Sequence, residues 1–190
     1  MTGWTAPGLL LAMPRLPDPV FARTVVLLVE HDERGSFGLI LNRPTDTLLC
    51  ETLRKEGIDW SDGTEHVVWD GGPVVPEPHE PDGFILHHPA SPPAGDSEDF
   101  TAGFRLYPFP PEDEILAALT GEPRERLRFF LGYSAWGPGQ LERELLQDTW
   151  LLLPPDPALV FHTPPEVMWE TGFHSLGVEP NAIAPSHGLH

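Results

Sequence analysis

Apolar residues occur along this chain mainly in short runs between turn-forming residues, a spacing that predicts more strands than helices. Runs of about 4–8 apolar or β-branched residues bounded by Gly, Pro, Asn or Asp are typical of strands. The predicted strands are residues 8–13, 24–30, 37–42, 66–70, 83–87, 102–107, 127–134, 150–153 and 158–162. The run TVVLLVE at 24–30 is continuously apolar, which is typical of a strand covered on both faces.

Four segments have helical spacing. They are residues 46–56, 111–120, 138–147 and 164–176. Thr45 or Asp46 is expected to cap the first. The last has the pattern of a capping box, with Thr163 as N-cap, Pro164 at the first helical position and Glu166 two residues later, and Gly177 is its expected stop. Its apolar face is predicted to carry Trp169, Phe173 and Leu176.

The order of these elements predicts an α+β fold. Strands outnumber helices, and 24–30 with 37–42 is expected to form an antiparallel hairpin, so the sheet should be mixed and largely antiparallel. The chain shows neither an internal repeat nor a change of composition that marks a boundary. We therefore expect one domain over residues 1–178 and a flexible tail over 179–190.

The charge of the chain argues against one class of partner. Its 29 Asp and Glu against 11 Lys and Arg give a net charge of -18, a field that repels nucleic acid. A local basic segment contains Arg124, Arg126 and Arg128, which alternate and would share one face of a strand. We interpret that face as a solvated sheet edge, so direct nucleic-acid binding is not expected.

Location and redox chemistry are also constrained. Cys50 is the one cysteine, so neither an intramolecular disulfide nor a thiolate metal cage can form. No apolar run approaches the roughly 18 residues of a membrane span, and no basic residue precedes the first apolar run as in a signal peptide. We expect a cytoplasmic protein without a membrane partner.

The segment GYSAWGPGQLERELLQDTW, residues 132–150, concentrates the specialised residues. It predicts a strand end, a turn through Gly137 and Gly139, and a helix. A serine nucleophile elbow is disfavoured, because Trp136 stands where that motif requires glycine after Ser134. The turn could instead present helix N–H groups to an anion, with Gln140 as a further donor, or it could be purely structural.

Other candidates stand at strand ends. His31, Asn42 and His87 each fall there, and histidine is the natural acid or base near neutral pH. Glu142 could orient such a histidine, although a buried structural histidine is the alternative. The candidate ligand-binding residues are His31, Asn42, Gly71, Gly72, His87, Ser134, Trp136, Gly137, Gly139, Gln140 and Glu142. We assign no catalytic residue, metal ligand or cofactor.

Five ordered motifs carry a family resemblance. They are LLLAMPRLPDPVFARTVVLLVEH, GLILNRP, GGPV, GFILH and GYSAWGPGQLERELLQDTWL. With them the chain resembles the YqgE/AlgH family of bacterial proteins. The resemblance implies a compact α+β domain with a small closed barrel and a bifurcated sheet, flanked by helices. It implies no established biochemical activity, although members are often labelled as candidate transcriptional regulators. The acidic, Pro-rich loops at 77–81 and 88–100 depart from the family pattern.

Two functions follow as alternatives. The first is a cytoplasmic, non-enzymatic regulatory module that binds a protein or a small ligand. The second is a hydrolase-type enzyme acting on a small phosphorylated or sugar-containing substrate, with His31 or His87 and Glu142 beside the Gly137 turn. We favour the first because the residues do not form a complete catalytic set.

Overall fold

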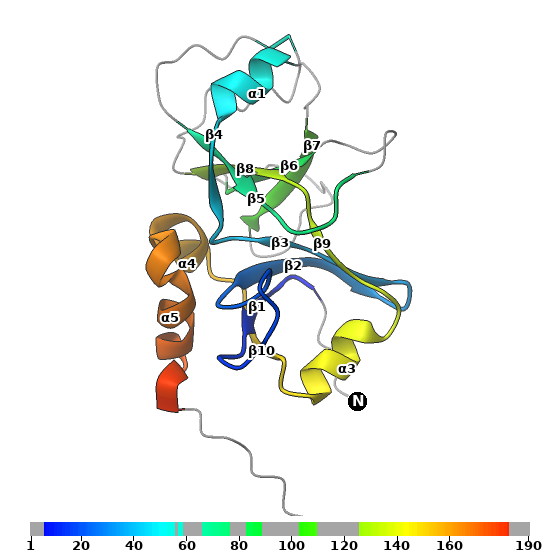
Figure 1. The fold of residues 1–190 in the computed structure, drawn as a ribbon, viewed down its shortest axis with the longest axis vertical. Coiled ribbons are helices and arrows are strands. Elements are labelled where there is room, and N and C mark those ends of the chain that lie inside the picture. Colours follow the sequence, from blue (N-terminus) through cyan, green and yellow to red (C-terminus); the bar gives the residue numbers. More distant parts are fainter. Residues whose placement is uncertain are drawn as a thin grey trace, which may run out of the picture.

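The protein is described by a computed structural model over residues 6–55, 57–58, 66–76, 83–88, 103–109 and 126–182. The strands form two five-stranded sheets, which lie one above the other in Figure 1. The first is antiparallel throughout, in the order β10 (Trp150–Leu153), β1 (Gly8–Ala12), β2 (Val25–Asp32), β3 (Gly35–Ile40) and β9 (Ser134–Trp136).

The second sheet is mixed. Its order is β4 (Pro44–Leu48), β5 (Val67–Asp70), β8 (Leu127–Leu131), β6 (Gly83–His87) and β7 (Arg105–Phe109). β5 and β8 run parallel, and the other neighbours are antiparallel. The mixed, largely antiparallel α+β class is therefore confirmed. The small closed barrel is not found among the described strands, where each sheet is open and ends in two edge strands.

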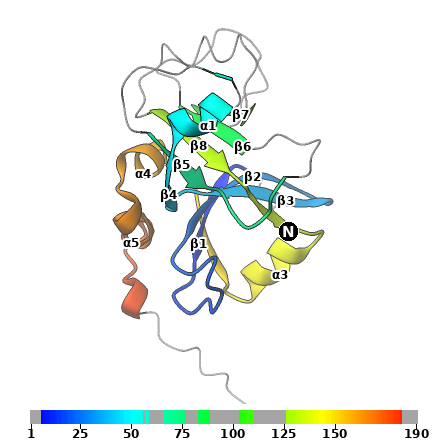
Figure 2. The ribbon, with the colours of Figure 1, turned by 45° about the horizontal axis from the view of Figure 1, so that its top comes forward.

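Helices cover the outer surfaces of this pair of sheets. They are α1 (Leu49–Lys55), α3 (Gln140–Leu146), α4 (Pro157–His162) and α5 (Pro165–Ser175), followed by the short 3-10 helix η3 (Pro180–Ala182). Figures 1 and 2 show α1 over the second sheet, α3 beside the first, and α4 with α5 along one side. Within the described parts of the chain, no helix is long and apolar enough to cross a membrane.

Strand alternation sorts the apolar side chains into three layers. In β1, Leu9 and Leu11 enter the central cluster between the sheets and α5, whereas Leu10 and Ala12 enter a cluster shared with α3. A third cluster joins the second sheet to α1. All residues from Val25 to Val29 are buried, which confirms the prediction that this strand is covered on both faces.

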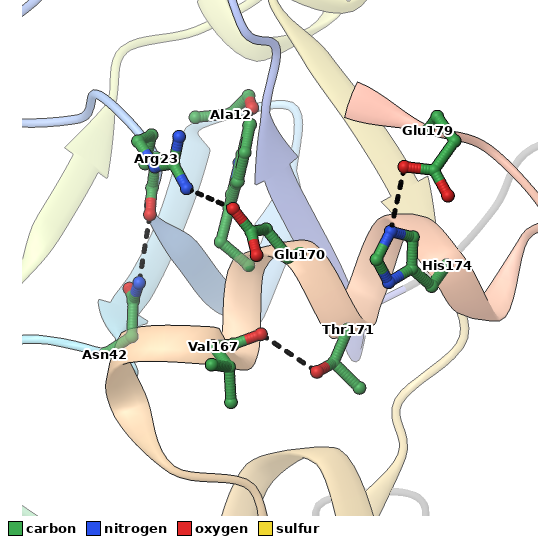
Figure 3. Close-up of polar contacts among 9 residues, drawn as sticks. Ala12, Arg23, Asn42, Val167, Glu170, Thr171, His174 and Glu179 are labelled. Carbon is green, nitrogen blue, oxygen red and sulfur yellow. Dashed lines mark hydrogen bonds and ion pairs between the residues drawn. The ribbon is translucent and has the colours of Figure 1, made fainter. Parts of the chain in front are cut away.

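Helix α5 packs against β1 and β2 at close range. A Cβ at Gly172 would clash with the side chain of Leu11, so glycine permits this approach. Trp169 donates from Nε1 to the carbonyl oxygen of Ala12 at 2.8 Å. On the outer face of the helix, Arg23 Nη2 pairs with Glu170 Oε1 at 2.6 Å (Figure 3).

Most predicted strands are present with boundaries shifted by a few residues, and the hairpin of β2 and β3 is confirmed by its antiparallel register. The predicted strand 127–134 is broken at Gly132, where φ is 68°, into β8 and β9. The predicted helix over 111–120 lies outside the described residues, as does most of the tail.

Two segments were predicted in the wrong conformation. Residues 46–48, predicted as the start of a helix, belong to strand β4, because this segment pairs with β5 and Thr45 Oγ1 donates to the carbonyl oxygen of Val68 at 2.6 Å. Residues 158–162 belong to helix α4 instead of a strand. Asp156 caps that helix by accepting from Ala158 N, and Pro157 occupies its first position.

The start of the last helix also differs from its prediction. Pro164 is the N-cap of α5, and no side chain caps it. Thr163 instead closes α4, since its Oγ1 donates to the carbonyl oxygen of Ala158. Leu176 is 44% exposed, so it does not belong to the buried face with Trp169 and Phe173. The predicted stop is confirmed by Gly177, with φ 69°.

Candidate functional site

Three polar side chains meet at the tip of the β2–β3 hairpin, and we call this group the hairpin site: His31, Ser36 and Glu142. His31 and Ser36 are register partners, and His31 Nδ1 lies 2.8 Å from Ser36 Oγ in a hydrogen bond. His31 Nε2 lies 3.8 Å from Glu142 Oε1, which comes from the first turn of α3. The predicted pairing of a histidine with Glu142 is thus present in the fold.

Exposure within the hairpin site rises from Ser36 through His31 to Glu142. Ser36 is buried, the His31 side chain is 14% exposed, and the Glu142 side chain is 48% exposed. The imidazole offers one hydrogen-bonding nitrogen to each neighbour, and the outer carboxylate can accept hydrogen bonds from a partner. Ser36 was not among the residues predicted from the sequence. The predicted hairpin could have identified Ser36, because a short turn places His31 and Ser36 opposite each other.

Two other candidates serve a structural cluster around Glu144. Glu144 Oε2 accepts from the indole Nε1 of Trp136 at 2.9 Å and of Trp150 at 2.7 Å. Glu144 Oε1 accepts from Gln140 Nε2 at 2.8 Å, and Gln140 Oε1 accepts from Gly137 N at 3.1 Å. The polar groups of Trp136 and Gln140 are therefore used within the protein, and their acceptor, Glu144, was not among the residues predicted from the sequence.

The turn into α3 is built from the two glycine candidates. Gly139 is the N-cap of the helix, with φ 67°, and it accepts a backbone hydrogen bond from Arg143 N. Gly137 is exposed and lies directly after Trp136, which pairs with Ser36 between β9 and β3. The turn thus adjoins the hairpin site and carries Glu142 toward His31.

Gly71, Gly72 and Ser134 lie together at the junction of the two sheets. Ser134 is fully buried and donates from Oγ to the carbonyl oxygen of Gly71 at 3.1 Å. That oxygen also accepts from Ile40 N in the first sheet at 2.9 Å. Gly72 has φ 145°, and a Cβ there would clash with Ser134 Oγ. This group holds the sheets together and is buried away from the hairpin site.

Asn42 and His87 lie elsewhere. Asn42 Oδ1 accepts from Val25 N at 3.0 Å, and its Nδ2 donates to the carbonyl oxygen of Arg23 at 2.9 Å (Figure 3). Asn42 is thus at the opposite end of the hairpin from His31. His87 is buried in β6, with its ring 6.4 Å from that of Tyr107. The fold therefore does not bring all the candidates into one pocket.

The prediction that Arg128 lies on a solvated sheet edge is wrong. It lies in β8, between β5 and β6, and is only 7% exposed. Its guanidinium lies 4.2 Å from the ring centre of Trp69, and Nη1 donates to the carbonyl oxygen of Leu41 at 2.7 Å. Burial lowers the pKa of Arg128 to about 10. The sequence feature that could have predicted this burial is the position of Arg128 inside the apolar run LRFFL.

The described residues contain no group of three or more His, Cys, Asp or Glu side chains that could hold a metal ion.

Comparisons with known proteins agree over nearly the whole chain. The sequence model of the AlgH-like family matches residues 9–181. A UPF0301 protein of Myxococcus xanthus is 38% identical over 185 residues, covering 97% of each chain. A UPF0301 protein of Methylococcus capsulatus is 38% identical over 181 residues, covering 94% of this chain and 93% of the relative.

Two solved structures have a similar fold. The solution structure of the AlgH protein from Pseudomonas aeruginosa matches with a TM-score of 0.71 and 31% identity, covering all of both chains. The crystal structure of a protein from Corynebacterium diphtheriae matches with a TM-score of 0.70 and 20% identity, covering 92% of this chain and 88% of the other. The second likeness concerns the fold alone.

Proposed function

The chain belongs to the AlgH-like family, and we propose that it is a cytoplasmic, non-enzymatic regulatory module that binds a protein or a small ligand at the hairpin site. One observation carries this proposal. Of the predicted candidates, His31 and Glu142 form a pair that reaches the surface, with Glu142 half exposed. Gln140 and Trp136 are hydrogen-bonded to Glu144, and Ser134 and Asn42 are hydrogen-bonded to the backbone.

The hydrolase alternative has less support from the geometry. Nucleophilic catalysis needs a hydroxyl that a substrate can approach while a base removes its proton. Ser36 is hydrogen-bonded to His31, but it is only 8% exposed and lies in β3, which is paired with β2 on one side and β9 on the other. A binding role uses the outer carboxylate of Glu142 and requires no access to Ser36.

A melting-temperature screen tests the proposal. Nucleotides, sugar phosphates and other small metabolites are added to the wild type and to Glu142→Gln. A compound that binds only the folded state raises the melting temperature by mass action. We expect a shift in the wild type that is reduced in Glu142→Gln, and we expect the compound to be recovered unchanged after incubation.

Glu166→Gln is the matched control, because Glu166 is another exposed glutamate in the first turn of a helix. It should retain the full shift. Conversion of any compound to a product would overturn the non-enzymatic assignment. If a ligand raises the melting temperature of Glu142→Gln as much as that of the wild type, the ligand does not bind at the hairpin site. If no compound binds, the proposal that the hairpin site binds a protein is tested by comparing the binding of a protein partner to Glu142→Gln and to Glu166→Gln.

A further inference from the structure

The direction of the Arg128 side chain follows from strand alternation. Phe130, two residues further along β8, belongs to the central apolar cluster between the sheets, so Arg128 projects to the same side. The backbone partner of Arg128 across the sheet is Leu86, which also belongs to that cluster. A guanidinium is thus held among apolar side chains, where an unpaired charge is strongly destabilising.

The interactions that offset this cost are few. The Arg128 guanidinium lies over the rings of Trp69 at 4.2 Å and Phe161 at 5.8 Å, and such cation–π contacts offset part of the cost. A guanidinium carries five N–H donors. Over the described residues, the hydrogen bond to Leu41 is its one recorded hydrogen bond, and no carboxylate pairs with it.

Further basic groups gather around the same ring. His88 stacks on Phe161, with ring centres 5.9 Å apart and planes at 24°. Arg126 Nη1 donates to the carbonyl oxygen of His88 at 3.3 Å. Burial, followed by the positive charges of Arg126 and His162, lowers the pKa of His88. Arg126 and Arg128 thus place two positive charges at the start of β8 in a protein of net charge -18, while the lowered pKa of His88 favours its neutral form.

We propose that Arg128 anchors a binding site for a small molecule that carries a carboxylate or a phosphate group. The planar guanidinium can bind two oxygens of such a group through parallel N–H donors, while Trp69 and Phe161 hold the fork in one orientation. The positive charge of the neighbouring Arg126 increases the local attraction for an anion. We call this the Arg128 site, defined by Arg128, Trp69 and Phe161.

This inference goes beyond the proposed function and is independent of it. The hairpin site uses residues of the first sheet and α3, whereas the Arg128 site uses β5, β8 and α4. An experiment that disproves one of the two proposals therefore leaves the other unaffected. Glu142→Gln should impair the hairpin site and leave anion binding at Arg128 unchanged.

Nuclear magnetic resonance of the arginine side chains tests the Arg128 site directly. The ¹⁵N-labelled protein is titrated with inorganic phosphate, and separately with acetate, at an ionic strength held constant with sodium chloride. We expect a saturable change in the Nε–Hε signal of Arg128 with at least one anion. The anion with the higher affinity shows whether the site favours phosphate or carboxylate.

Two substitutions of Arg128 sharpen the test. Arg128→Lys keeps the charge but loses the planar fork, so the affinity should fall at least about tenfold. Arg128→Met has a side chain of similar length without the charge. The saturable changes that the anion causes in the backbone amides of β8 should therefore disappear in this variant. Arg34→Met is the control, because the Arg34 side chain is 86% exposed on the β2–β3 turn and should not affect the affinity.

Some outcomes would overturn the inference. If neither anion changes the Nε–Hε signal of Arg128 in the wild type, the inference is wrong, and no variant is needed to show it. Saturable amide changes in β8 that persist in folded Arg128→Met would also overturn the inference, since binding would then not need the guanidinium. If Arg128→Met does not fold, the wild-type titration and Arg128→Lys decide the question.

Discussion

Glu144 and Arg128 show two ways in which this fold holds a charge away from water. Glu144, on α3 beside the first sheet, is partly buried and accepts hydrogen bonds from Trp136, Trp150 and Gln140. Arg128, in the second sheet, is more deeply buried, yet its recorded contacts are one carbonyl oxygen and the faces of two rings.

The difference between these regions separates structure from function. A carboxylate that receives three N–H donors has its hydrogen-bonding capacity largely used, so Glu144 serves to join α3 to β9 and β10. The Arg128 guanidinium still has hydrogen-bonding capacity that an oxyanion could use. Burial alone therefore does not show that a charge is structural, and the number of partners is the better guide.

The largest expected effect comes from breaking the Glu144 cluster. Glu144→Ala leaves two buried indole N–H groups without their acceptor, and hydrogen bonds to a charged group contribute about 1.5–3 kcal/mol each. We expect the free energy of unfolding to fall by about 2–4 kcal/mol. Urea denaturation followed by tryptophan fluorescence measures the loss.

Glu142→Ala is the control for that change, because it removes a glutamate from the same helix at a half-exposed position. It should lower the free energy of unfolding by less than about 1 kcal/mol, as for other surface ion pairs. Equal losses in the two variants would mean that the indole hydrogen bonds do not distinguish Glu144 from an ordinary surface residue.

A smaller effect is expected for the buried cation. Arg128→Met replaces a charge with an apolar side chain of similar length, which removes the desolvation cost while it forfeits the hydrogen bond to Leu41 and the ring contacts. We expect the free energy of unfolding to change by less than about 1 kcal/mol, measured by urea denaturation without added anion. A loss of about 3–5 kcal/mol would indicate that Arg128 is mainly structural.

The smallest effect concerns pH at the Arg128 site. Because the pKa of His88 is lowered in the fold by burial and by Arg126 and His162, the unfolded chain binds a proton more readily. This histidine therefore leaves stability unaffected above its ordinary pKa of 6.5 and reduces it as the pH falls below that value. Urea midpoints at pH 7.5 and 5.5 should show a larger loss in the wild type than in His88→Gln.

Arg126→Gln serves as the companion variant, because it removes one of the two positive neighbours of His88. The acid-dependent loss should be intermediate between those of the wild type and His88→Gln. If His88→Gln retains the whole pH dependence of the wild type, other groups account for the acid sensitivity, and the positive field around Phe161 has no measurable effect on His88.

Local patterns in the sequence determined the positions of most strands, the β2–β3 hairpin and the end of α5 at Gly177. These features depend on neighbouring residues, since strand alternation, turn chemistry and positive φ are properties of short segments. The family could also be predicted from ordered motifs. The start of α4 after Asp156 and Pro157 had a local signal that the strand prediction overlooked.

Tertiary structure alone decided which side chains meet. Residues 46–48 lie in strand β4 because β5 offered backbone partners to this segment, which outweighed local helix signals. His31 meets Glu142 because α3 returns to the hairpin tip more than a hundred residues later in the chain, while Asn42 and His87 are carried elsewhere. Arg128 is buried because β5, β6 and α4 surround it. Periodicity describes how one segment lies, whereas a site depends on contacts between segments far apart in the chain.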